Sequence, residues 1–177
     1  IQELHKSYKV AADAYRKAYE VSETDTEQHK ESLQSLARVY QCMNWFPESQ
    51  QLYIDYKKQY EWNADIAYYY AVLLVMMDAA KDAIDELLPF VDDSACARKL
   101  LDIYGDAGFI DLAHETFEYI ISKDPENHRV YGAMGDIFRD HAMYADAKPL
   151  YERAIALDTN KEANYYSEWL ECMIQLK

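Results

Sequence analysis

The chain has 177 residues, half of them apolar, which is enough for one domain or for a short array of repeated units. Its formal net charge of −14 at pH 7 repels the phosphates of nucleic acids and anionic lipid, so nucleic-acid binding is not expected. Four Gly and four Pro are too few for the turns of a many-stranded sandwich or barrel, and an all-α protein is the class that remains.

The first predicted element covers residues 3–21 and has the form of half a repeat. Ala11, Tyr15 and Ala18 are spaced at 4 and 3 residues, which is typical of one face of a helix. A short loop rich in acidic and hydroxyl residues follows, and Thr26 is expected to cap the next helix.

A pair of small residues twelve positions apart then recurs four times along the chain. The first members of these pairs are 34, 30 and 34 residues apart, and large apolar residues flank them at offsets of 3 and 4. Such spacing predicts two antiparallel amphipathic helices per unit, which cross closely where the small residues meet. The pairs are Ala37 and Ser49, Ala71 and Ala83, Leu101 and Ala113, and Gly135 and Ala147. All of these residues are small except Leu101.

These pairs predict four repeats, and both ends of the chain break within a unit. Pro89 should end its helix near Leu88, ahead of a connection four residues short. At the other end, Tyr166, Ser167 and Leu170, with Ala163 before them, predict a further first helix, acting as a half repeat or a cap. Because both ends break within a unit, we expect a segment of a longer protein. The predicted units are 30–62, 63–93, 94–127, 128–160 and the terminal 161–177, all within a single array over 1–177.

The pattern resembles the tetratricopeptide repeat (TPR), whose 34-residue signature spaces aromatic, small and Ala residues in this way. The resemblance covers roughly residues 30 to 160. It implies a right-handed superhelical array of antiparallel helix hairpins, with the first helix of each hairpin lining a concave face that binds peptides. The fourth unit matches best, through Tyr131, Met134, Gly135, Phe138, Ala147, Tyr151 and Ala154.

The resemblance also indicates which residues face the concave side. Arginines recur there in a chain that has few of them, beside an aromatic residue, and this combination is typical of a surface that holds carboxylates. The alternative is that the arginines only neutralise neighbouring acids such as Asp102 and Asp136. The candidate peptide-binding residues are Gln34, Arg38, Gln41, Tyr68, Val72, Arg98, Asp102, Arg129, Asp136 and Arg139.

No motif for catalysis or for a cofactor emerges from the sequence. The five histidines have no metal-ligand spacing, and the glycines do not form a phosphate loop. We therefore expect no enzyme activity, no cofactor and no metal. Three widely spaced cysteines fit neither a disulfide framework nor a zinc site and indicate a reducing compartment, which we take to be the cytoplasm.

The sequence thus predicts a non-enzymatic scaffold that binds a peptide segment of another protein, for which the arginines would suit an acidic partner. The alternative is a structural spacer or self-association element of a larger repeat protein, joined end to end. The longest dense apolar run, 66–77, is too short to cross a bilayer, so no membrane insertion is expected.

Overall fold

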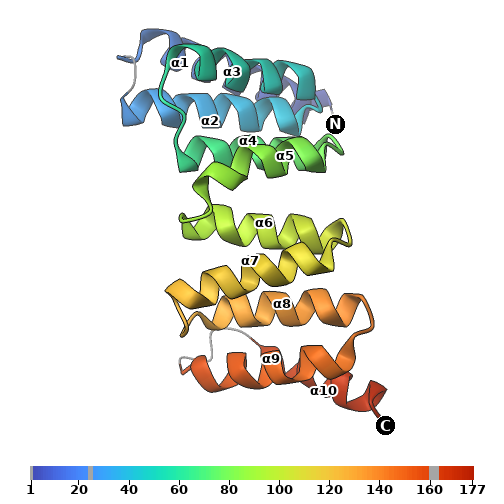
Figure 1. Cartoon of the computed structure of the whole chain (residues 1–177). Coiled ribbons are helices and arrows are strands. Elements are labelled where there is room, and N and C mark those ends of the chain that lie inside the picture. Colours follow the sequence, from blue (N-terminus) through green and yellow to red (C-terminus); the bar gives the residue numbers. More distant parts are fainter. Residues whose placement is uncertain (1, 24–25, 160–163) are drawn as a thin grey trace. The chain divides into compact units, whose positions relative to one another are not determined.

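The computed structural model describes residues 2–23, 26–159 and 164–177, and the side chains from residue 7 onward within these ranges. The described residues form an all-α array of helix hairpins, as the sequence predicts (Figure 1). The chain divides into two compact units, Ile1–Phe90 and Val91–Lys177, and each is described by itself.

Unit 1 holds two complete hairpins preceded by a long helix. Helix α1 contacts α2, and α2 contacts both its hairpin partner α3 and the next first helix, α4. We call α2 and α4 first helices, and α3 and α5 second helices. The elements are α1 (Gln2–Val21), α2 (Glu27–Cys42), α3 (Phe46–Gln59), α4 (Ala64–Met76), α5 (Ala80–Leu87) and the short 3₁₀ helix η1 (Leu88–Phe90).

Unit 2 repeats this arrangement with two hairpins followed by one helix. The first helices α6, α8 and α10 contact their neighbours in order, so α8 touches both α6 and α10. Second helices α7 and α9 complete the hairpins. The elements are α6 (Ser94–Asp106), α7 (Ile110–Lys123), α8 (His128–Asp140), α9 (Tyr144–Leu157) and α10 (Tyr165–Gln175).

The small residues lie where the two helices of each hairpin cross. Ala37 and Ser49 are completely buried, and the Ser49 hydroxyl donates to the Ala37 carbonyl across α2 and α3 at 3.1 Å. At Gly135 the approach is closer still, since an added Cβ would lie 2.9–3.1 Å from the ring of Tyr151. Close crossing therefore depends on these positions, as the sequence pattern indicated.

The turn inside each hairpin has the same backbone geometry in all four cases. After α2, the Asn44 amide donates to Gln41 O at 2.9 Å and the Trp45 amide to Tyr40 O at 2.8 Å, and the other turns repeat this pair of hydrogen bonds. This is the Schellman motif, which needs one residue in the left-handed region. The left-handed residues, with φ between 57° and 75°, are Asn44, Asp78, Gly108 and Ala142.

Several helix ends follow the signals in the sequence. The Thr26 hydroxyl accepts the His29 amide at 3.2 Å, which confirms the predicted cap of α2. Helix α5 ends at Leu87 and continues as η1 through Pro89, which confirms the predicted end near Leu88. Among the described residues, no helix is long and apolar enough to cross a membrane.

The predicted register of the last helix, α10, is wrong. On α10, Tyr166 and Leu170 are 60% and 53% exposed, and the chain instead buries Cys172 and half-buries Tyr165 and Trp169. These lie 34 residues after Phe138, Tyr131 and Gly135, so the 34-residue spacing continues and shifts the expected register by two residues. Ala163, part of the same expectation, lies outside the described residues.

Helix α1 departs from its expected face at one residue. Ala12 is buried against Leu36, Val39 and Tyr40 of α2, and Ala11 packs half-buried against the same cluster. Ala18 is also half-buried, whereas Tyr15 remains 40% exposed. The expected face is therefore met at the two alanines and wrong at Tyr15.

Candidate peptide-binding surface

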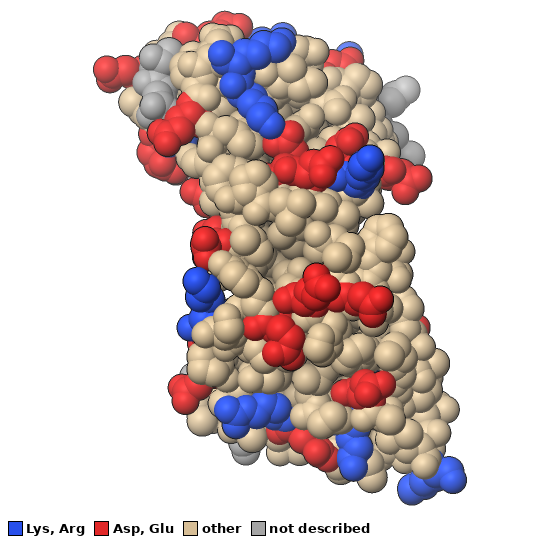
Figure 2. All heavy atoms as spheres, viewed as in Figure 1, with Lys and Arg blue, Asp and Glu red and all other residues tan. Residues whose placement is uncertain are grey.

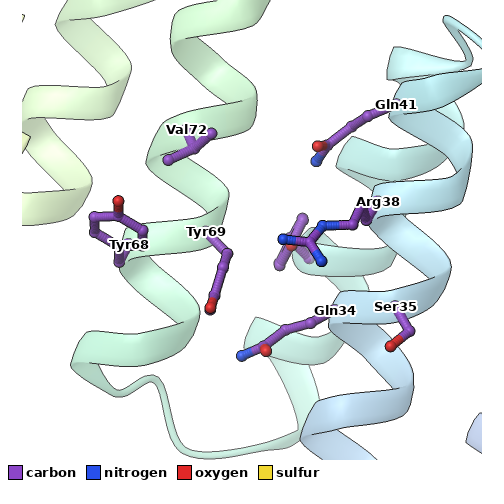
Figure 3. A pocket seen from close by; sticks show the side chains of 8 residues that line it. Gln34, Ser35, Arg38, Gln41, Tyr68, Tyr69 and Val72 are labelled. Atoms are coloured by element: carbon purple, nitrogen blue, oxygen red, sulfur yellow. The ribbon is translucent and has the colours of Figure 1, made fainter.

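In unit 1 the predicted residues gather around one open pocket of about 290 Å³ between α2 and α4. All five concave-face candidates of this unit line it. Figure 3 shows the side chains of Gln34, Arg38 and Gln41 extending from α2 toward α4. The lining residues are Gln34, Ser35, Arg38, Gln41, Tyr53, Tyr68, Tyr69 and Val72. We call this the α2–α4 pocket.

Helix geometry explains why these residues meet. Gln34, Arg38 and Gln41 are spaced by 4 and 3 residues, and Tyr68 and Val72 by 4, so each set occupies one face of its helix. The two first helices contact each other directly, which turns these two faces toward a common space.

Three lining residues were not among the predicted site residues. Tyr69 is next to Tyr68, and the rings are 5.4 Å apart in an edge-to-face arrangement. Tyr53 comes from the second helix α3, where its repeat position marks it as core, and its side chain is almost completely buried. The repeat spacing does not indicate that the Tyr53 phenol also reaches the pocket. The one signal in the sequence is the hydroxyl itself, because Leu87 and Phe117 at the same repeat position have none.

The polar groups of the α2–α4 pocket make no hydrogen bond or ion pair with the described residues. Within the described part of the chain, the Arg38 guanidinium makes no ion pair and no hydrogen bond, and no carboxylate lines the pocket. The side-chain amides of Gln34 and Gln41 and the phenols of Tyr53 and Tyr69 also lack hydrogen bonds there. Such groups are free to bind a ligand without first breaking a contact inside the protein.

The Tyr53 phenol is strongly held in its neutral form. Burial raises its pKa well above the usual range, and Tyr69 adds to this effect, while the positive charge of Arg38 opposes it. A neutral phenol keeps its proton and can donate a hydrogen bond to an incoming acceptor.

In unit 2 the predicted residues also come together, but mostly with one another. Arg98 pairs with Asp102, Nε to Oδ1 at 3.2 Å, and donates to the Arg129 carbonyl at 3.0 Å. Arg139 pairs with Asp136 at 3.1 Å and with Asp140 at 2.9 Å. Arg98 and Arg139 therefore have the internal acidic partners that the sequence left open as an alternative.

Asp136 is further engaged by a tyrosine. The Tyr151 hydroxyl donates to Asp136 Oδ1 at 2.8 Å. Burial raises the pKa of Asp136, and the hydrogen bond from Tyr151 and the charge of Arg139 work against this rise. Burial also raises the pKa of Tyr151, and the adjacent Asp136 carboxylate raises it further.

The segment α2–α3–α4 of unit 1 is related to α8–α9–α10 of unit 2 at a distance of 98 residues. The residues of the helices match position by position, apart from the first residues of α2 and α4, whose counterparts precede α8 and α10. The hairpin crossing, the phenol and the apolar stripe recur, whereas the charges differ. The equivalents are Ala37 and Gly135, Arg38 and Asp136, Gln41 and Arg139, Tyr53 and Tyr151, Tyr68 and Tyr166, and Val72 and Leu170.

Across residues 2–23, 26–159 and 164–177 there is no group of three or more His, Cys, Asp or Glu side chains placed to hold a metal ion. Acidic side chains outnumber basic ones on the face shown in Figure 2. Within the described residues Arg16 and Arg153 also make no ion pair, but Arg16 donates to the Tyr40 hydroxyl and Arg153 lies over the Tyr131 ring, whereas Arg38 makes neither kind of contact.

Solved structures of several TPR proteins are similar to nearly the whole chain. MamA matches with a TM-score of 0.66 at 20% identity, over 90% of this chain and 94% of that chain. YrrB, described as a TPR protein with an unusual peptide-binding site, matches with a TM-score of 0.64 at 17% identity, over 96% and 84%. TTC0263, a thermophilic TPR protein of Thermus thermophilus, gives 0.67 at 12% identity, over 94% and 91%.

No protein-family model matches the sequence, and no curated protein matches it either. The structural similarities confirm the fold that the sequence pattern implied.

Proposed function

We propose, starting from the tetratricopeptide-repeat fold that the chain shares with these structures, that the protein is a non-enzymatic interaction scaffold. Its first-helix face would hold a peptide segment of a partner protein. The observation that carries the proposal is the α2–α4 pocket, where five residues expected on that face surround one space and their polar groups make no hydrogen bond or ion pair within the described part of the chain.

The pocket offers both kinds of contact that an extended peptide needs. Tyr68 and Val72 supply an aromatic and an aliphatic surface, and the amides of Gln34 and Gln41 can donate to and accept from a peptide backbone. YrrB is described as having an unusual peptide-binding site, which supports peptide recognition on this fold as a precedent and no more.

The predicted residues of unit 2 are expected to contribute less to peptide binding. Arg98, Asp102, Asp136 and Arg139 are paired among themselves, so a ligand would have to displace an existing contact. We therefore expect the α2–α4 pocket to contribute most of the binding energy. The three cysteines are free thiols, which supports a location in the cytoplasm.

The test is a selection of peptides from a random phage-displayed library on the whole chain, followed by affinity measurements with Tyr68→Ala. Removing a central aromatic residue should weaken a selected peptide by about 30-fold, the loss expected of a hot spot of about 2 kcal/mol. Tyr15→Ala is the matched control, because Tyr15 is an exposed tyrosine on α1 outside the pocket. A library without binders, or equal affinities for both variants and the natural chain, would contradict the proposal.

One observation favours the second candidate function, self-association. Helix α10 presents a stripe of apolar side chains four residues apart, Tyr166, Leu170 and Ile174, which are 60%, 53% and 58% exposed. If this stripe joins copies of the chain, light scattering will show a mass above 20.8 kDa that returns to the monomer value in Leu170→Glu. A monomer at all concentrations would exclude it.

A further inference from the structure

We propose that the α2–α4 pocket selects a carboxylate of its partner, which would lie between the Arg38 guanidinium and the Tyr53 phenol. The inference rests on the proposed peptide-binding function and adds the chemical group that is recognised.

Unit 2 contains a carboxylate at the place in question. Tyr151, the equivalent of Tyr53, donates its hydroxyl to Asp136 at 2.8 Å, and Arg139 pairs with the same carboxylate at 3.1 Å. A buried phenol and a guanidinium thus converge on one carboxylate, which is the usual combination for a charge-assisted hydrogen-bonded pair.

The equivalent place in unit 1 keeps the phenol but changes both charged positions: Arg38 stands at the position of Asp136, and Gln41 at that of Arg139. Tyr53 lines the pocket, and Arg38 is close enough to influence its ionisation. No acidic residue is among the described residues that line the pocket. Unit 1 therefore offers a phenol and a guanidinium to the same space without an acceptor among the described residues, and a carboxylate from outside would complete the set of groups found in unit 2.

The remaining groups of the pocket favour a carboxylate over other anions of similar charge. The described lining residues supply one guanidinium, phenols and amides, and no second cation, so one unit of negative charge is balanced and a doubly charged phosphate is not. Tyr68 and Val72 border the same space, and we expect the carboxylate to belong to a segment that also carries an apolar side chain.

A carboxylate can come from an Asp or Glu side chain or from a chain terminus. Two phage libraries separate these sources, one displaying random peptides without a free C-terminus and one displaying them with it. Enrichment of Asp or Glu in the first library identifies a side chain, and enrichment that occurs only in the second identifies a terminal carboxylate.

The decisive measurement is a double-mutant cycle on one selected peptide. For a side-chain carboxylate, the peptide and its Glu→Gln or Asp→Asn version are titrated by fluorescence anisotropy against the natural chain and Arg38→Gln. For a terminal carboxylate, the second peptide carries a C-terminal amide. The natural chain should prefer the carboxylate by about tenfold or more, and Arg38→Gln should lose most of that preference. Tyr53→Phe should lose a smaller part, because only one hydrogen bond is removed.

Arg98→Gln is the matched control, since this first-helix arginine already pairs with Asp102. It should leave the preference for the carboxylate unchanged. Arg38 is exposed at the pocket, so its replacement is not expected to affect folding.

The outcomes distinguish the two proposals. If peptides are selected and depend on Tyr68, but show no acid enrichment and no change in Arg38→Gln, the carboxylate inference is wrong and the peptide-binding function stands. If no peptide is selected, or selected peptides ignore Tyr68, the proposed function fails and the inference fails with it.

Discussion

Two equivalent places in the chain, the α2–α4 pocket of unit 1 and the α8–α10 region of unit 2, differ in how they use the same tyrosine. In unit 2 the Tyr151 phenol is satisfied by Asp136, and Arg139 neutralises that carboxylate. In unit 1 the Tyr53 phenol faces a pocket whose described lining includes a guanidinium and no acid. Two exchanges, Arg38 for Asp136 and Gln41 for Arg139, separate a self-contained structural contact from a group available to a ligand.

A position in the repeat therefore does not by itself define whether a residue is structural or available for binding. Both tyrosines are nearly or completely buried and both fill the same slot against the first helix. What differs is whether the neighbouring side chain completes the hydrogen bond within the protein or leaves it for a partner.

The largest expected effect comes from the helix crossing beneath Tyr151. Gly135→Val places a Cβ 2.9–3.1 Å from that ring and adds two methyl groups, so it should destabilise the chain by about 3 kcal/mol through overpacking. The free energy of unfolding from denaturant titration measures this. Ala37→Gly, at the equivalent position of unit 1, should cost only about 1 kcal/mol through helix propensity. A loss of less than about 1 kcal/mol for Gly135→Val would contradict the close crossing at this position.

A smaller effect should separate the two phenols directly. Tyr151→Phe removes the donor to Asp136 and should cost about 1 kcal/mol, because that carboxylate is partly exposed and water can replace part of the hydrogen bond. Tyr53→Phe removes a hydroxyl that makes no hydrogen bond within the described residues, and should change the free energy of unfolding by less than about 0.5 kcal/mol. Thermal unfolding of both variants measures the contrast, and the reverse order would contradict it.

The smallest effect is a dependence of the free energy of unfolding on pH. It should come from Asp136 in unit 2 and not from Arg38, its equivalent in unit 1. Burial raises the pKa of Asp136 above its ordinary value of 3.8, so between 3.8 and the raised value the folded state binds more protons than the unfolded state. The contribution of Asp136 to stability is therefore greatest at low pH and is lost as the pH rises through this window.

Asp136→Asn removes this contribution. We expect the natural chain to lose stability relative to the variant as the pH is raised from below 3.8 to neutrality, measured by denaturant titration at each pH. A constant difference between the two proteins would show that Asp136 titrates normally.

Most of the fold could be predicted from the sequence, because it depends on short-range spacing. The pairs of small residues and the large residues at offsets of 3 and 4 fix which faces of the helices meet. The same spacing was sufficient to bring Gln34, Arg38 and Tyr68 onto one surface, since residues four apart on a helix share a face.

The parts that could not be predicted depend on longer-range choices of side chains. Arg98 and Arg139 carry the same charge as Arg38, but whether a flexible guanidinium finds an acid depends on its rotamer and on its neighbours in space. The α10 register failed for a related reason. Tyr165 and Tyr166 are adjacent, and only packing against Gly132, where an added Cβ would lie 2.4 Å from the Tyr165 ring, decides which of them turns inward.

The hairpin turns carry a consequence for how such a chain tolerates change. Their hydrogen bonds join main-chain atoms only, and the left-handed position accepts asparagine, aspartate, glycine and even alanine in this one molecule. A bend that is specified by the course of the backbone can persist when nearly every residue around it is replaced. Divergence over long times can therefore change most of the sequence of such a protein while its architecture persists.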